Sequence, residues 1–317
     1  MKIYMPVEFP EPLMTGWDED VVLDVDRSGL PVSREVMKAH LKDAGAVVIN
    51  LDDVFDREMI DAAPELKAIA LFAGSTDHID TAYAREKGIA ICTAMGEIYE
   101  NTADLTFGLL MAAARRIPEA DRYVRAGRYG RWEPAGLLGG DIYGKTLGIL
   151  GLGRIGSAVA RRGRGFGMNI LYTALHGPKP EAERELGCRY VSKEDLLRQS
   201  DFLCLHCKLS AETEHIIGRD ELAVMKPGAY LINTGRGRLV DEKALAWALR
   251  ERVIAGAALD VFEKEPKILP ELLELDNVVL TPHLGASTLD NRLGMAASLA
   301  KQLRAVLRRA GAEGEKA

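Results

Sequence analysis

Short hydrophobic runs alternate with amphipathic stretches along most of the chain. Two stretches in the first hundred residues, "SREVMKAHLKDAG" and "HIDTAYAREKG", carry their hydrophobic residues at helical spacing and end at glycine. The runs around them have the length and composition of buried strands: "KIYMP", "AVVIN", "KAIALF" and "IAICT". This alternation predicts parallel strands covered by helices.

The same pattern continues after residue 100 and predicts a second sheet. A long apolar helical stretch, "TADLTFGLLMAAARRIPEADRYVRAG", comes first. Six further strands are expected at "TLGILGLG", "NILYT", "DFLCLHC", "AYLINTG", "IAGAALDVF" and "NVVLTPH". A helix from about Thr288 could return to the first sheet. The sequence therefore predicts an α/β protein with two doubly wound parallel-sheet domains, residues 98–288 and a smaller discontinuous domain of residues 1–97 plus 289–317.

Composition narrows the class of protein. The chain has 317 residues, a formal net charge of −6 and 47% hydrophobic residues, which suits two folded domains of ordinary size. An acidic chain does not attract nucleic acid or anionic membranes by its bulk charge. No apolar run is long enough to span a bilayer, and the first residues lack the pattern of a signal peptide. We therefore expect a cytoplasmic protein with no nucleic-acid or membrane partner.

The pair Cys204 and Cys207, in "CLHC", has the spacing of redox and zinc motifs. A buried strand is the simpler interpretation, because an offset of three places the two thiols on opposite faces of a strand. Such thiols cannot share a metal ion. We therefore expect no metal site and reduced cysteines.

The glycines Gly151, Gly153 and Gly156 fit the pattern G-x-G-x-x-G between an expected strand and an expected helix. In that context the first glycine allows a tight turn, and the second lets the backbone approach a pyrophosphate. The third lets helix and strand pack closely, with the diphosphate at the helix N-terminus. The motif in this setting predicts a dinucleotide cofactor.

The chain lacks the acid that usually follows this fingerprint. An Asp or Glu at the end of the second strand binds the ribose hydroxyls of NAD, but Thr173, Ala174 and His176 stand there. The Arg that accommodates the 2′-phosphate of NADP is absent too, and only His176 and Lys179 are basic nearby. We expect use of both cofactors, NADP and NAD, with a modest preference for NADP.

Three stretches at the ends of later strands carry candidate catalytic side chains. They are "LINTGRGRLVDE" with Arg236, "ALDVFEKEP" with Glu265 and "LTPHLGAST" with His283. With these motifs in order after the glycine fingerprint, the chain resembles the D-isomer-specific 2-hydroxyacid dehydrogenases, closest to the glyoxylate/hydroxypyruvate reductases. The resemblance extends from about Phe72 to Arg292. It implies a Rossmann domain, a smaller flavodoxin-like substrate domain, and reduction of a 2-oxo acid by NAD(P)H.

The resemblance also implies roles for these side chains. His283 would give a proton to the carbonyl oxygen, and Glu265 would favour the protonated imidazole. Arg236 would hold the substrate carboxylate and polarise the carbonyl. The backbone N–H groups of Ala73 and Gly74 would face the substrate. Glu263 lies two residues from Glu265, so one of the two could be merely solvated, but Glu265 matches the family's position before proline.

Cofactor contacts follow from the same resemblance. Asp260 would lie near the nicotinamide amide, and Thr102 would touch the cofactor where the domains join. Lys208 stands where relatives usually have proline and is either a solvated lysine or a cation for a 2′-phosphate. The full expected set is Thr102, Gly151, Gly153, Arg154, Ile155, Gly156, Cys207, Lys208, Thr213, Thr234, Gly235, Asp260, His283 and Gly285.

Several assignments stay open at this point. Glyoxylate, hydroxypyruvate and 3-phosphohydroxypyruvate share the 2-oxo acid group, and the first seventy residues show no cationic cluster, which favours unphosphorylated acids. A nucleotide-sensing corepressor, a 3-phosphoglycerate dehydrogenase and a formate or phosphite dehydrogenase are alternatives. Glu265 argues against formate dehydrogenase, whose pattern has glutamine there. The apolar faces of the helical stretch from Thr102 suggest burial by a second subunit, so we expect a homodimer.

Overall fold

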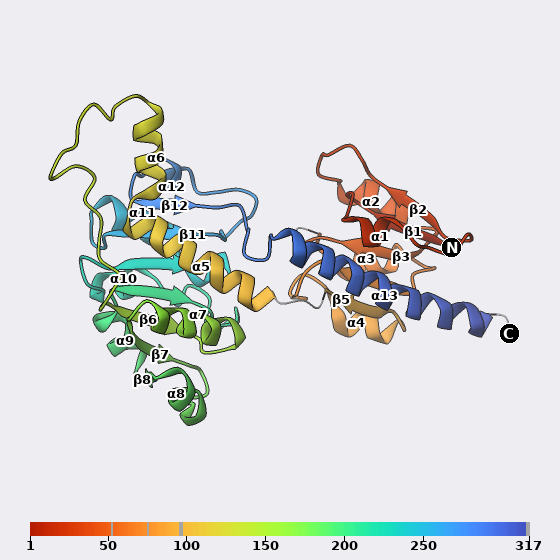
Figure 1. The fold of residues 1–317 in the computed structure, drawn as a ribbon. Helices are drawn as coiled ribbons and strands as arrows, with labels where there is room; N and C mark the ends of the chain where they lie inside the picture. Colours follow the sequence, from red (N-terminus) through yellow and green to blue (C-terminus); the bar gives the residue numbers. More distant parts are fainter. Residues whose placement is uncertain (52, 75, 95–97, 315–317) are drawn as a thin grey trace. The chain divides into compact units, whose positions relative to one another are not determined.

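The chain forms two compact units. The structure is a computed structural model, and it describes residues 1–51, 53–74, 76–94 and 98–314, with side chains as far as residue 309. One unit comprises Met1–Ile98 and Thr288–Ala317, and the other comprises Tyr99–Ser287. Figure 1 shows the ribbon of both units.

The first unit is built on a five-stranded parallel sheet with the strand order β2-β1-β3-β4-β5. This is the order of flavodoxin-like folds. The strands are β1 (Lys2–Met5), β2 (Val22–Val25), β3 (Ala44–Ile49), β4 (Ala68–Leu71) and β5 (Ala90–Thr93). The hydrophobic pattern predicts four of them but not β2, an edge strand whose residues are all at least partly exposed.

Helices from both ends of the chain cover this sheet. They are α1 (Glu11–Met14), α2 (Arg34–Leu41), α3 (Arg57–Asp61), α4 (Thr81–Glu86) and α13 (Leu289–Gly314). The Ser33 and Asp80 side chains cap α2 and α4 by accepting backbone hydrogen bonds. α13 packs against β4 and β5, and its Met295, Leu299 and Leu303 are buried in the core of this sheet.

The second unit contains a seven-stranded parallel sheet with the strand order β12-β11-β10-β9-β6-β7-β8. Six of these positions follow the Rossmann order, whose topological switch point lies between β6 and β9. The strands are β6 (Thr146–Leu150), β7 (Asn169–Thr173), β8 (Cys188–Tyr190), β9 (Phe202–Leu205), β10 (Tyr230–Asn233), β11 (Gly256–Leu259) and β12 (Val278–Leu280). The hydrophobic pattern predicts six of these strands but not β8, a three-residue edge strand.

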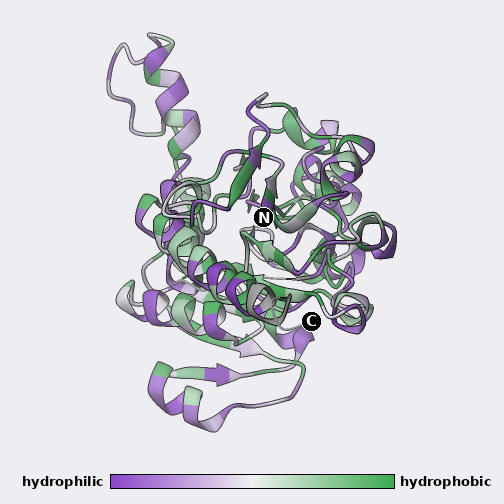
Figure 2. Cartoon of the chain, turned by 90° about the vertical axis from the view of Figure 1, so that its right-hand side faces the viewer, coloured by the Kyte–Doolittle hydropathy of each residue, from purple (hydrophilic) through white to green (hydrophobic). Residues whose placement is uncertain are grey.

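Hydrophobic cores cover both faces of this sheet. Along β9, Phe202 and Cys204 pack into one cluster, and Leu203 and Leu205 pack into the other, as strand geometry requires. The covering helices mix hydrophobic and hydrophilic residues along their length (Figure 2). They are α5 (Ile98–Ala114), α7 (Arg154–Gly165), α8 (Pro180–Leu186), α9 (Lys193–Gln199), α10 (Arg219–Val224), η1 (Gly237–Leu239), α11 (Glu242–Arg250) and α12 (Pro270–Leu273).

The long helical stretch predicted from Thr102 is two helices. α5 ends at Ala114, and α6 spans Ile117–Arg125. Arg116 between them has a left-handed backbone with φ 55°, which interrupts the helix. None of the α6 side chains is buried, and α6 and the segment after it project from the seven-stranded sheet (Figure 1). Among the described residues, no helix is both long and apolar enough to cross a membrane.

Candidate active site

The glycine turn after β6 shows why each of its three glycines is needed. A Cβ on Gly151, whose φ is 103°, would lie 2.5 Å from the Cys207 nitrogen. A Cβ on Gly156 would lie 2.2 Å from the Gly151 oxygen. A Cβ on Gly153 would meet nothing within 4 Å. The first and third glycines thus allow close packing within the protein, whereas the second borders open space where a ligand can approach the backbone.

The N-terminus of α7 suits an anionic ligand. Gly153 is its N-cap and offers no side chain to accept from the first N–H groups of the helix. These donors and the helix dipole favour negative charge. Arg154 is exposed at the first position and Ile155 is half-buried at the second. Together with the open space at Gly153, this arrangement fits the diphosphate of a dinucleotide.

The loop after β7 has no carboxylate at its start. Ala174 is half-buried, and Leu175 and His176 are exposed. The Lys179 ammonium donates a 2.6 Å hydrogen bond to the carbonyl of Leu152, inside the glycine turn. The backbone N–H of Lys179 donates to the Tyr172 hydroxyl at 2.6 Å. The Lys179 cation therefore ties the loop after β7 to the glycine turn. We call this loop, residues 174–179, the ribose loop.

The loop after β9 lies directly against the glycine turn. The Thr213 hydroxyl donates to the Lys208 carbonyl at 2.7 Å and accepts from the Ser210 N–H at 2.8 Å, which closes the loop. The Lys208 side chain is exposed. Cys207 packs on the opposite core from Cys204, and burial raises the pKa of Cys207 to about 11. No cluster of His, Cys, Asp and Glu able to hold a metal ion occurs in the described residues.

Three buried threonines connect two of the expected cofactor residues. The Thr106 hydroxyl donates to the Thr102 carbonyl at 2.7 Å. Because its hydrogen is used there, Thr106 accepts from the Thr234 hydroxyl, which lies 2.8 Å away. A Cβ on Gly285 would lie 3.3 Å from the Thr102 Oγ1. Thr102, Thr234 and Gly285 thus gather around the N-terminal half of α5.

The turn that carries Arg236 is held by Asn233 at the end of β10. The Asn233 amide donates to the Arg236 carbonyl at 3.0 Å, and its oxygen accepts from the Gly235 N–H at 3.1 Å. The Arg236 guanidinium donates to the Gly235 carbonyl at 2.7 Å. The polar side chain of Asn233 is almost completely buried, so this turn is fixed from below.

Asp260, at the end of β11, organises the loop that carries His283. Its carboxylate accepts from the Thr281 hydroxyl at 2.6 Å, the Leu284 N–H at 2.7 Å and the Gly285 N–H at 2.8 Å. Burial raises the pKa of Asp260, although these hydrogen bonds oppose the change. Asp260 has no exposed surface, so its role is to fix the loop that carries His283.

His283 and Glu265 form a direct hydrogen bond. The His283 Nδ1 lies 2.8 Å from a Glu265 oxygen, and the Phe262 N–H donates to the other oxygen at 2.8 Å. Burial raises the pKa of Glu265, but the hydrogen bonds from His283 and Phe262 and the charges of His283 and Arg236 outweigh it, so the pKa lies below its usual value. Glu265 is therefore ionised near neutral pH and can only accept, which places a hydrogen on Nδ1.

The backbone of His283 is held in an uncommon conformation. Its φ is 55°, in the left-handed region that residues other than glycine rarely adopt. The His283 N–H donates to the Asp260 carbonyl at 2.9 Å, which fixes this conformation. Such backbone strain is concentrated at functional sites.

The predicted residues thus divide between the two units. Arg236, Glu265, His283 and the cofactor set belong to the second unit; most of them follow its strands, and Thr102 lies in α5. Ala73 and Gly74 follow β4 in the first unit, where Ala73 is buried and Gly74 is exposed.

One residue beside the glycine turn, His206, is absent from the set predicted from the sequence. His206, whose N–H donates to the Leu150 carbonyl at 2.8 Å, has two buried ring nitrogens without a hydrogen-bond partner. Burial lowers the pKa of His206 to about 4, so the ring is neutral at physiological pH. Nothing in "CLHC" pointed to this isolation, because it arises from the packing around the end of β9.

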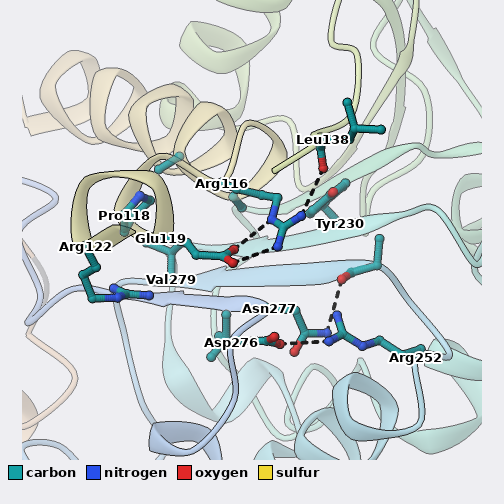
Figure 3. A pocket seen from close by; sticks show the side chains of 14 residues that line it. Arg116, Pro118, Glu119, Arg122, Leu138, Tyr230, Arg252, Asp276, Asn277 and Val279 are labelled. Atoms are coloured by element: carbon teal, nitrogen blue, oxygen red, sulfur yellow. Dashed lines mark hydrogen bonds and ion pairs between the residues drawn. The ribbon is translucent and has the colours of Figure 1, made fainter. Parts of the chain in front are cut away.

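A cavity of about 340 Å³ lies elsewhere in the second unit, beside the base of α6. Arg116 pairs there with Glu119, and Arg252 pairs with Asp276 (Figure 3). The lining includes none of the residues expected to bind substrate or cofactor, and two of its three arginines are neutralised by acids. The candidate active site is therefore the set of strand ends and not this cavity.

Comparison with known proteins agrees with this geometry. Residues 107–285 match the model of the family described as D-isomer specific 2-hydroxyacid dehydrogenase, NAD binding domain. The chain is 47% identical over 305 residues to a glyoxylate reductase of Korarchaeum cryptofilum, which covers 95% of this chain and 91% of that protein.

Solved structures give the same result. The TT0316 protein of Thermus thermophilus superimposes with a TM-score of 0.91 at 39% identity and covers 97% of both chains. An NADPH-dependent glyoxylate/hydroxypyruvate reductase of Sinorhizobium meliloti has a TM-score of 0.79 at 30% identity and covers 96% of this chain and 94% of its own.

Proposed function

The chain belongs to the D-isomer-specific 2-hydroxyacid dehydrogenase family, and we propose that it reduces small unphosphorylated 2-oxo acids, glyoxylate or hydroxypyruvate, with NAD(P)H. The observation that carries this proposal is the 2.8 Å hydrogen bond between Glu265 and His283 in a unit that also holds the glycine turn. The names of the similar proteins support the choice of substrate.

Proton transfer is assigned to His283. The bound nicotinamide cofactor supplies a hydride to the carbonyl carbon. Because the His283 Nδ1 is engaged with Glu265, its Nε2 is the nitrogen that gives a proton to the carbonyl oxygen. The ionised Glu265 stabilises the imidazolium before transfer and fixes the ring orientation. In oxidation of the hydroxy acid the same nitrogen takes the proton back.

Substrate orientation is assigned to groups from both units. The planar Arg236 guanidinium binds the carboxylate and polarises the carbonyl, since it presents two parallel donors. Ala73 and Gly74, in the first unit, are assigned to substrate binding through their backbone N–H groups. On this proposal residues 1–97 plus 289–317 form the substrate-binding domain, and residues 98–288 form the dinucleotide-binding domain.

The cofactor is held by the glycine turn and the strand ends next to it. Gly151, Gly153 and Gly156 with the N–H groups of Arg154 and Ile155 receive the diphosphate. The nicotinamide end is assigned to Thr102, Thr234, Gly235, His283 and Gly285, with the buried Asp260 near it holding the His283 loop, and the adenosine end is assigned to Cys207, Lys208 and Thr213.

A modest preference for NADP follows from the loop after β7. Ala174 presents no carboxylate to repel a 2′-phosphate, while the exposed Lys179 and Lys208 supply cations and the exposed His176 a further hydrogen-bonding group on the adenosine side. Contacts of exposed cations are worth only several-fold in affinity, so both cofactors are used.

Exposed hydrophobic side chains on α6 and the segment after it support a homodimer. Trp132 is 75% exposed and Tyr143 is 83% exposed, and Ile117, Val124, Tyr129 and Leu138 are also exposed. A surface of this kind calls for a partner, and a second copy of the chain fits the proposal. Light scattering tests the dimer by measuring the molecular mass of the wild type, of Trp132→Ser and of Leu30→Ser, a similarly exposed control in the first unit. A wild type with the mass of one chain would refute the dimer.

The direct test of the function is a substrate panel. Purified protein is mixed with NADPH or NADH and with glyoxylate, hydroxypyruvate or 3-phosphohydroxypyruvate, and the loss of reduced nicotinamide is followed by absorbance. We expect turnover with the first two acids and, in reverse, oxidation of D-glycerate but not L-glycerate. Tight cofactor binding without turnover would favour a nucleotide-sensing protein, and a preference for the phosphorylated acid would overturn the assigned substrate class.

A further inference from the structure

We propose that Glu242 and Glu263 form a brace that positions Glu265 for proton transfer, so that both are positioning residues of the reaction. The inference rests on the proposed function, because it takes Glu265 and His283 as the proton-transfer pair. From the sequence, Glu263 could be a merely solvated acid, and no motif assigns a role to Glu242.

The two glutamates bond to each other's backbone. The Glu242 N–H donates to a Glu263 carboxylate oxygen at 3.0 Å, and the Glu263 N–H donates to a Glu242 carboxylate oxygen at 2.7 Å. Glu242 is the first residue of α11, and Glu263 lies four residues after β11. The reciprocal pair therefore ties the start of a helix to a loop from the neighbouring strand.

This brace joins the two loops that carry the proposed catalytic groups. The segment from β10 to α11 contains Arg236, and the segment from β11 to α12 contains Glu265. A Cβ on Gly237 would lie 1.8 Å from the Phe262 carbonyl carbon, so the two backbones are in direct contact. Any side chain at Gly237 would separate the loops, and the brace lies one residue beyond that contact in the second loop.

The brace acts on Glu265 through one peptide unit. The Phe262 N–H donates to Glu265 at 2.8 Å, and the next residue, Glu263, is fixed by both of its hydrogen bonds with Glu242. Glu265 in turn bonds to His283. Releasing Glu263 therefore frees the donor that orients the Glu265 carboxylate, and the imidazole loses its fixed partner.

Charge and hydrogen bonding can be separated at this site. Burial and the charges of Glu263 and Glu265 raise the pKa of Glu242, while its hydrogen bond from the Glu263 N–H and the charge of Lys264 lower it. The His215 Nε2 lies 3.1 Å from the Glu263 carboxylate. A neutral glutamine oxygen accepts the same backbone hydrogen bond as a carboxylate. Glutamine therefore removes the charge but keeps an oxygen that accepts the backbone hydrogen bond.

The test compares Glu263→Ala with Glu263→Gln. Both lose the charge, and only alanine loses the acceptor. We expect alanine to lower kcat ~10-fold or more, with cofactor KM within about twofold of wild type, and glutamine to stay within about threefold. The pH at which reduction falls off should move downward in both Glu263→Ala and Glu265→Gln, and should stay near the wild-type value in Glu263→Gln.

Two further variants keep the test decisive. Glu263→Asp keeps the charge but shortens the side chain by one methylene, so it should behave like alanine. Glu251→Ala makes the same substitution at the exposed far end of α11 and should match the wild type. Equal kcat and pH profiles for Glu263→Ala and Glu263→Gln would overturn the brace. An unshifted profile in Glu265→Gln would instead overturn the proposed function on which it rests.

Discussion

The loops after β10, β11 and β12 differ sharply from the loop after β7, although all four lie at the same edge of one sheet. Asn233, at the end of β10, fixes the first of these loops, and Asp260 and Glu265, both after β11, bond to the loop after β12 that carries His283. Each of the three residues makes two or more hydrogen bonds. In the loop after β7, Leu175 and His176 are exposed, and Lys179 supplies the contact to the glycine turn.

This difference separates the loops that carry the proposed catalytic groups from the loop that sets the choice between NADP and NAD. Buried, mutually bonded groups hold a reacting geometry because each removal leaves an unpaired polar atom. Exposed cations on a loop attract a phosphate without fixing it, and solvent screens them. Substitutions in the loops after β10, β11 and β12 should therefore lower kcat. Substitutions in the ribose loop should change only the relative use of NADPH and NADH.

The largest expected effect is at His283. His283→Asn should lower kcat ~10²-fold or more, because it removes general acid catalysis, and should leave cofactor affinity nearly intact. Steady-state kinetics and a cofactor titration by fluorescence measure both quantities. Turnover within about threefold of wild type would remove His283 from the proton-transfer step.

The next effect concerns the pH dependence. Glu265→Gln removes a carboxylate whose own pKa is lowered, so the charge that favours the protonated imidazole is lost throughout the neutral range. The upper pH limit of reduction should then move downward, because the protonated form persists only at lower pH. The profile of kcat/KM with saturating cofactor checks this, and an unchanged profile excludes Glu265 from the unit.

A smaller effect is expected in the ribose loop. Ala174→Asp should provide a carboxylate for the ribose hydroxyls, repel the 2′-phosphate and turn the preference to NADH. The wild type should favour NADPH only several-fold, as expected for exposed cations. The values of kcat/KM for NADPH and NADH, in the wild type and in Ala174→Asp, test both expectations. A wild type that favours NADH by more than ~100-fold would show that a group outside this loop holds the ribose.

The cations of the same side can be tested one at a time. Lys208→Ala and Lys179→Ala should each weaken NADPH a few-fold and leave NADH nearly unchanged, since only NADPH carries the extra phosphate. Dissociation constants for both cofactors measure the difference. Equal losses for the two cofactors would place the lysine at the shared diphosphate instead.

The smallest effect concerns stability. The pKa of Glu242 is raised above 4.5 in the folded chain, so the folded state binds the proton more tightly than the unfolded state. Its stabilising contribution is present below the unfolded pKa and is lost as pH rises through the folded value. Glu242→Gln should therefore raise the apparent melting temperature by about 1–3 °C at pH 7.5, and the gain should shrink toward pH 4.5. A decrease at pH 7.5 would contradict this.

Most of the fold was predictable because most strands are buried. The central strands read as continuous hydrophobic runs, which parallel sheets covered on both faces require. β2 and β8 were missed because an edge strand needs fewer hydrophobic residues, and β8 is only three residues long. The break between α5 and α6 was missed although Pro118, in the first turn of α6, marks it in the sequence; the backbone turns left-handed at Arg116.

The sequence by itself determined the family, the glycine turn and the side chains that can carry a proton or bind a carboxylate, because these need particular residue types at particular spacings. Tertiary structure alone decided how Glu242 meets Glu263, how Lys179 reaches Leu152 and how Asp260 holds the His283 loop. Each of these contacts joins residues 21 to 27 positions apart on different strand ends. Local spacing carries no information about such pairs, because the folded sheet creates their neighbourhood.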